Sequence, residues 1–162
     1  MNRRRGLSVV RIGLIAGIVG IVIVAAGVAS FFVDQSSRKS PYEVELYPGA
    51  EYWGMRDVQA TSRDVFYRAA DDAERVVGYY QQKMNEHYGD SVEHCVRVDS
   101  VVRASSRSES VVPFQVRCMF DRSGFGSTQY TLVLIYPGLP DPDPFYDAEG
   151  MTVIKYEQQW QP

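Results

Sequence analysis

The sequence IGLIAGIVGIVIVAAGVASFFV, residues 12–33, decides the architecture that we expect, because it contains no charged side chain. A helix needs about 20 apolar residues to cross a hydrocarbon core that is about 30 Å thick. Within lipid, a single segment can satisfy its backbone hydrogen bonds only as a helix. We therefore expect one transmembrane helix over residues 12–33, preceded by a basic tail over residues 1–11.

The charges around this segment predict its orientation. Four arginines and no acidic residue precede it, and Asp34 follows it directly. The positive-inside rule then places the N-terminus of a single-pass cell-membrane protein in the cytoplasm and the C-terminal part outside it. The alternative is a cleaved signal peptide, because Gly27 and Ala29 are small residues suitably placed for cleavage before Ser30. The apolar run exceeds the roughly 7–15 residues of a signal core, which favours a retained anchor.

Small residues recur at helical spacing within the apolar segment and predict a helix-packing face. They are Gly13, Ala16, Gly17, Gly20 and Gly27. Small side chains let a second helix approach closely, so this face predicts contact with other transmembrane subunits as well as with the lipid bilayer. The alternative is that the glycines only reflect the usual composition of membrane helices.

The remainder of the chain is acidic, with 13 basic and 20 acidic side chains and a net charge of −7. Such a domain repels phosphate backbones, which excludes nucleic acid as a partner. Residues 34–49 are polar and contain two prolines, which predicts a tether. The folded extracytoplasmic domain is then expected over residues 50–162.

The pattern of this domain predicts an α+β fold. Apolar residues at i+3 and i+4 spacing predict an amphipathic helix over residues 72–88, with Asp71 as its cap, Glu74 completing a capping box and Gly89 ending it. Runs rich in Val, Tyr, Phe and Thr predict strands over residues 51–60, 63–69, 92–103, 111–121, 128–136 and 151–160. One amphipathic helix covers one face, so we expect it on one side of a mainly antiparallel sheet.

Cys95 and Cys118 are the only cysteines, and outside the cytoplasm such a pair usually forms a disulfide. Their positions are symmetric about the expected hairpin turn, which places them opposite each other. Strand alternation indicates the contrary, because it points Val96 and Val98 inward and Cys95 outward, whereas Cys118 points inward. A bulge near His94 would remove the conflict. Separate reduced thiols are the alternative.

The most distinctive loop is PGLPDPDPFYDAEG, residues 137–150. Phe145 and Tyr146 lie on a backbone stiffened by proline, which makes them candidate partner-contact residues. Its acidic residues also suit calcium, but the prolines and the missing turn glycine disfavour a calcium loop. The chain has no P-loop, GxSxG, HExxH or CxxC motif. We therefore predict no catalytic, cofactor-binding or metal-binding residues and no small-molecule substrate.

The segments Tyr47-Pro48-Gly49-Ala50 and DDAERVVGYY, residues 71–80, are similar to a domain of uncharacterised bacterial membrane-anchored proteins and lipoproteins. The resemblance covers residues 47–90. In that family Gly-Trp usually follows the helix, whereas here Gly89-Asp90 follows it. The resemblance implies a YPGA-type α+β extracytoplasmic domain and transfers no catalytic residue.

Together these features predict a non-enzymatic, single-pass accessory or structural subunit of a larger bacterial membrane complex, of the respiratory or photosynthetic electron-transfer class. The alternative is a membrane-anchored ligand-binding or sensory domain of the cell envelope. That alternative predicts a preformed pocket between helix and sheet, lined by tyrosine and tryptophan.

Overall fold

The computed structural model describes residues 9–104, 109–124 and 126–161. The chain divides into two compact units, Met1–Ser37 and Arg38–Pro162, and each is considered by itself. Helix α1 (Val9–Ser37) forms the first unit, and none of its described side chains is buried. The stretch Arg11–Ser37 is long and apolar enough to cross a membrane, a property that signal sequences share. This confirms the apolar helix predicted for residues 12–33 and adds about one turn at each end.

The residues of the expected helix-packing face all belong to α1. They are Gly13, Ala16, Gly17, Gly20 and Gly27. A carbon added at any of the four glycines would lie more than 4 Å from the rest of the described chain, apart from its own helical neighbours. The described part of the chain therefore leaves this side of α1 uncovered, and its packing against other subunits remains a prediction.

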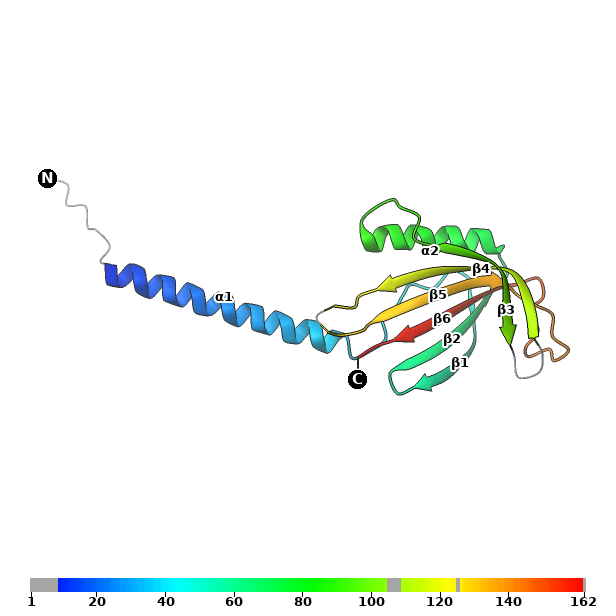
Figure 1. The fold of residues 1–162 in the computed structure, drawn as a ribbon, viewed down its shortest axis with the longest axis horizontal. Coiled ribbons are helices and arrows are strands. Elements are labelled where there is room, and N and C mark those ends of the chain that lie inside the picture. The colour runs from blue at the N-terminus through cyan, green and yellow to red at the C-terminus, as the bar shows by residue number, and fades with distance from the viewer. Residues whose placement is uncertain (1–8, 105–108, 125, 162) are drawn as a thin grey trace. The chain divides into compact units, whose positions relative to one another are not determined.

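The second unit is a six-stranded antiparallel sheet with one helix (Figure 1). Its elements are β1 (Glu51–Gln59), β2 (Ser62–Ala69), α2 (Ala73–Tyr88), β3 (Val96–Ala104), β4 (Glu109–Asp121), β5 (Tyr130–Pro137) and β6 (Thr152–Gln159). The strand order is β1-β2-β6-β5-β4-β3, so β3 to β6 form a meander and the β1–β2 hairpin joins its far edge. The predicted α+β class, with the helix on one side of an antiparallel sheet, is confirmed.

Helix α2 forms where the sequence predicts it, but its cap lies one residue later than expected. The Asp72 carboxylate, rather than that of Asp71, accepts the backbone N–H of Glu74 at 2.8 Å. Asp71 instead accepts from the Tyr47 hydroxyl at 2.9 Å. Gly89 ends the helix in the left-handed conformation, with φ 71°, which glycine adopts without a Cβ clash.

The space between α2 and the sheet is filled. Its core consists mainly of Val65, Val76, Tyr80, Met84, Cys118, Phe120, Val133, Ile135, Ile154 and Tyr156. The Tyr80 and Tyr156 hydroxyls lie 2.7 Å apart, so each buried phenol has a polar partner. Burial raises the pKa of both phenols above the usual range. Side chains therefore occupy the space between helix and sheet, apart from a hollow of about 280 Å³ at its edge, which Tyr42, Lys83, His87 and Phe120 help to line.

Residues 38–50 cover the rest of this face and differ from the tether predicted for residues 34–49. The Tyr42 carbonyl accepts from the side chains of Thr131 and Gln158, and the Tyr79 hydroxyl donates to the Leu46 carbonyl. Tyr47 is buried in the core. The compact unit thus begins at Arg38 rather than near residue 50, because sheet and helix side chains bind this backbone.

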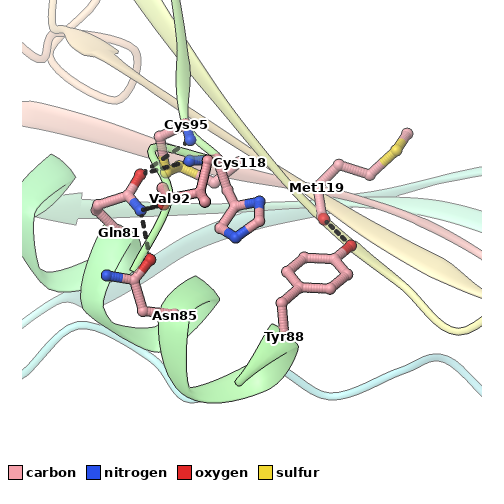
Figure 2. The surroundings of a disulfide bond; sticks show 8 residues. Gln81, Asn85, Tyr88, Val92, Cys95, Cys118 and Met119 are labelled. Atoms are coloured by element: carbon pink, nitrogen blue, oxygen red, sulfur yellow. Dashed lines mark hydrogen bonds between the residues drawn. A yellow bond between two sulfur atoms is a disulfide. The ribbon is translucent and has the colours of Figure 1, made fainter. Parts of the chain in front are cut away.

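Cys95 and Cys118 form a disulfide, as predicted, at the start of the β3–β4 hairpin (Figure 2). Val96 pairs with Arg117, so the cysteines lie directly opposite each other without a bulge. Cys95 is buried, whereas Val96 is 61% exposed, and the predicted inward direction of Val96 is therefore wrong. The side-chain amide oxygen of Gln81, on α2, accepts the backbone N–H groups of His94 and Cys95, both at 3.0 Å, which turns Cys95 toward the helix.

Candidate partner-contact site

The face of the sheet opposite α2 carries a second, smaller apolar cluster. It consists of Val112, Leu134, Tyr136, Ala148 and Val153, with Trp53, Val101, Leu132 and Leu139 packed against it. Ala148 and Leu139 come from the loop between β5 and β6, so this cluster fixes that loop to the sheet. We call this side of the sheet the open face, because α2 and residues 38–50 pack on the other side.

The loop between β5 and β6 is built by its own carboxylates. Asp141 accepts the backbone N–H of Asp143 at 2.9 Å, and Asp143 accepts that of Phe145 at 3.0 Å. Asp147 accepts the N–H groups of Asp141 and Glu149 at 3.3 and 3.1 Å. Such bonds hold Asx turns, so these carboxylates shape the backbone. Within the described residues, no three His, Cys, Asp or Glu side chains are grouped to hold a metal ion.

Contacts with the sheet fix the same loop from outside. The Trp53 indole donates to the Phe145 carbonyl at 2.8 Å, and Arg68 donates to the Asp147 carbonyl at 3.2 Å. At Gly138 a Cβ would lie 1.9 Å from the Ala148 carbonyl oxygen, so only glycine permits this close approach. The loop is therefore fixed at its start, at its tip and at its end.

Phe145 and Tyr146 project from this fixed backbone into solvent. Their side chains are 63% and 50% exposed, and their rings meet edge to face with centroids 5.0 Å apart. Two large aromatic rings on an ordered backbone lose little conformational entropy on binding, which is the usual character of an interface anchor. This is the loop that the sequence predicts as a partner-contact site, and the structure gives it a rigid form.

A hollow of about 370 Å³ lies beside the smaller cluster on the open face. It is lined by Val101, Val102, Gln115, Arg117, Leu132, Leu134 and Glu157. Ser100, with φ 55°, and Pro113 lie between the paired positions of β3 and β4 at the point where the hairpin bends. Phe114 packs with the core beneath α2, whereas Val112 packs on the open face. The side chains of β4 therefore exchange the faces to which they point between these two residues. Sequence alternation alone does not predict this change, although a proline inside a strand marks such irregularities.

Charged residues cross the open face as a paired network. Lys155 lies 3.0 Å from Asp64 and 2.5 Å from Glu157, and Arg56 lies 2.6 Å from Asp64. Asp64 and Lys155 are buried, and a buried charge is tolerated when it is paired. This network is satisfied within the chain, which explains the charges without invoking catalysis.

The two histidines occupy the end of α2 and the connection to β3. His94 lies 2.6 Å from Asp90, and its hydrogen bond holds the pKa of that carboxyl below the usual range. His87 contacts the Tyr42 hydroxyl at 3.2 Å and the Phe120 ring. These contacts brace the end of the helix against residues 38–50 and β4.

Comparisons with known proteins return nothing that resembles the chain: no family model matches it, and neither a curated protein nor a solved structure matches it significantly. The resemblance of residues 47–90 to YPGA-type domains therefore remains a prediction.

Proposed function

We propose that this chain is a non-enzymatic, single-pass accessory subunit of a larger bacterial membrane complex. In this proposal α1 spans the cell membrane with its N-terminus in the cytoplasm, and the second unit lies outside the cytoplasm. The disulfide supports an extracytoplasmic location, because such bonds persist in oxidising compartments. Respiratory and photosynthetic electron-transfer assemblies are the class of complex that we propose, by analogy with their small single-pass subunits.

The observation that carries the proposal is the rigid loop with its exposed aromatic pair. The loop's own carboxylates and the Trp53 indole fix the backbone around Phe145 and Tyr146. A partner that covers the exposed part of these two rings buries apolar area at small entropic cost. The open glycine face of α1 offers a second contact, to transmembrane helices of the same complex.

Purification of the full-length protein from its native membrane in mild detergent tests the proposal. We expect a stoichiometric partner that is retained by wild type and lost when Phe145 and Tyr146 are both replaced by alanine. Interface anchors of this type contribute about 2 kcal/mol or more, so the apparent affinity should fall at least about 30-fold. Tyr52→Ala is the matched control, because Tyr52 is also an exposed aromatic residue but lies at the sheet edge on β1. A monomer without any stoichiometric partner would contradict the proposal.

The hollow on the open face supports a second candidate, a membrane-anchored ligand-binding domain. Leu132 and Leu134 offer apolar surface, and Arg117 beside them has no ion pair in the described part of the chain. An apolar ligand with an anionic group therefore suits the hollow. Native mass spectrometry of the full-length protein would reveal such a ligand as added mass. Leu132→Trp, which fills the hollow, should abolish that mass, and an unliganded wild-type spectrum would remove this candidate.

A further inference from the structure

The second unit has two opposite ends, defined by its strands. At one end Ser62 of β2 and Tyr130 of β5 both pair with Gln159 of β6. At the other end Thr152 of β6 pairs with Pro137, next to the β5–β6 loop. At about 3.3 Å per residue, the seven steps from the first to the last residue of β6 separate these ends by about 23 Å. Figure 1 shows the final residues of β6 at one end of the sheet and the β5–β6 loop at the other.

The second unit begins with Arg38, which is held at the end of the sheet where β6 finishes. The backbone carbonyl of Arg38 accepts the backbone N–H of Gln161 at 3.0 Å, and the Arg38 guanidinium donates to the backbone carbonyl of Arg122. Arg38 is buried. Ser37, the residue before it, is the last residue of α1. We call this part of the unit the Arg38 end.

The number of residues between the apolar segment and Arg38 limits how far this end can lie from a bilayer. The apolar run ends at Val33, and the next four residues, up to Ser37, are helical. At 1.5 Å per residue they span about 6 Å. The headgroup layer on each side of a bilayer is about 5–7 Å deep. We propose that the Arg38 end of the domain lies against the lipid headgroups. This inference rests on the proposed function, in which α1 spans the membrane.

The surface at the Arg38 end has the composition that this position requires. Trp160 and the exposed Val58 line a hollow of about 450 Å³ beside the β1–β2 turn, and the backbone N–H of Trp160 donates to the Thr61 carbonyl at 3.0 Å. Tryptophan is enriched at membrane interfaces, where its apolar ring and polar N–H suit the headgroup region. The exposed charges there balance, with Lys39 and Arg122 against Asp57 and Asp121. Because these charges balance, the contact should depend little on anionic lipid or on salt.

Within the second unit, the partner-contact loop lies at the end opposite to the Arg38 end, about 23 Å away along β6. Because this loop belongs to the extracytoplasmic unit of the proposed function, a partner that covers Phe145 and Tyr146 must have an extramembrane part.

The two tryptophans of the chain mark its two ends and allow a direct test. Trp160 lies at the Arg38 end, whereas Trp53 donates to the Phe145 carbonyl at the loop end. The full-length protein is reconstituted into phosphatidylcholine vesicles whose acyl chains carry bromine, which quenches nearby indoles. Trp53→Phe leaves Trp160 as the only fluorophore, and its emission should fall by roughly half, as expected at the membrane interface. Trp160→Phe leaves Trp53, whose emission should hardly change.

A charge placed at either end sharpens the test. In the Trp53→Phe protein, Val58→Glu should reduce the quenching, because an acidic side chain at the interface opposes insertion. Val111→Glu is the matched control, since Val111 is equally exposed but lies on the β3–β4 hairpin toward the loop end. Far-UV circular dichroism of each variant confirms that the domain has folded.

The outcomes separate this inference from the proposed function. Equal, weak quenching of both tryptophans in protein that floats with the vesicles overturns the headgroup contact and leaves the membrane-anchored subunit intact. Failure of the full-length chain to float with vesicles overturns the membrane anchor, and with it both proposals. Loss of the partner in the Phe145 and Tyr146 variant is measured separately and concerns the proposed function alone.

Discussion

The two faces of the sheet differ in how completely the chain covers them. On one face α2 and residues 38–50 enclose a core in which Val76, Tyr80 and Ile135 are fully buried. On the open face, the smaller cluster stands beside an uncovered hollow and a loop whose two aromatic rings are in solvent. Side chains beneath α2 thus form the larger core, whereas the open face has a smaller buried cluster and leaves more of its apolar surface in contact with solvent. A partner or ligand is therefore to be sought on the open face and its loop.

Truncating one residue on each face of β5 gives the largest expected effect and tests this contrast directly. Ile135 is fully buried beneath α2, whereas Leu132 lines the hollow on the open face. Ile135→Ala should lower the free energy of unfolding by about 3–4 kcal/mol, because it leaves a cavity that the packed core cannot refill. Leu132→Ala should cost about 1 kcal/mol, since water already reaches its side chain. Denaturant unfolding of the full-length protein measures both, and equal costs would show that the faces are packed alike.

Removal of the disulfide tests how firmly β3 and β4 are held beneath α2. Replacing Cys95 and Cys118 together by alanine should cost about 3 kcal/mol, because the bond closes a chain segment with a sequence separation of 23 residues. A reductant should lower the stability of wild type by a similar amount and leave the variant unchanged. Hydrogen exchange should rise in β3 and not in the β5–β6 loop. Faster exchange in that loop would mean that the two faces unfold together.

Much of this architecture follows from periodicity in the sequence. The spacing of Val76, Tyr80 and Met84 predicts the buried face of α2, and alternation in β4 predicts that Cys118 and Phe120 point inward. These predictions succeed because each element buries one regular face. The exposed aromatic residues of the partner-contact loop were also predictable, since the prolines and acidic residues around them mark a turn-rich segment.

The remaining features depend on long-range contacts that local patterns do not specify. Residues 38–50 have the composition of a tether, yet Tyr42, Val44 and Leu46 alternate with Glu43 and Glu45, a signal of a packed, extended segment. Strand alternation predicts the wrong direction for Cys95, because Val96 and Val98 have the pattern of core residues. The hollow requires the bend at Ser100 and Pro113, whose shape arises only when the hairpin pairs with the rest of the sheet.

Gly138→Ala tests whether the partner needs the fixed backbone of the loop as well as its two aromatic rings. A Cβ at this position would lie 1.9 Å from the Ala148 carbonyl oxygen, so the loop backbone must shift. Overpacking of this kind typically costs about 1–3 kcal/mol. Partner retention in detergent should fall as strongly as with Phe145→Ala, although both aromatic rings remain. Unchanged retention would show that the partner recognises the rings without needing the fixed backbone.

Gly78→Ala should have the smallest effect, and the opposite sign. Gly78 lies on the solvent side of α2, and a Cβ there meets nothing within 4 Å. Alanine is favoured over glycine inside a helix by up to about 1 kcal/mol, so the variant should unfold at a temperature a few degrees higher, and Gly78→Ser should gain less. Both variants should retain the partner, because the proposed contact lies on the open face and its loop. If Gly78→Ala weakens partner retention while raising the unfolding temperature, the outer side of α2 is itself an interface, and the contrast between a closed and an open face no longer holds in the complex.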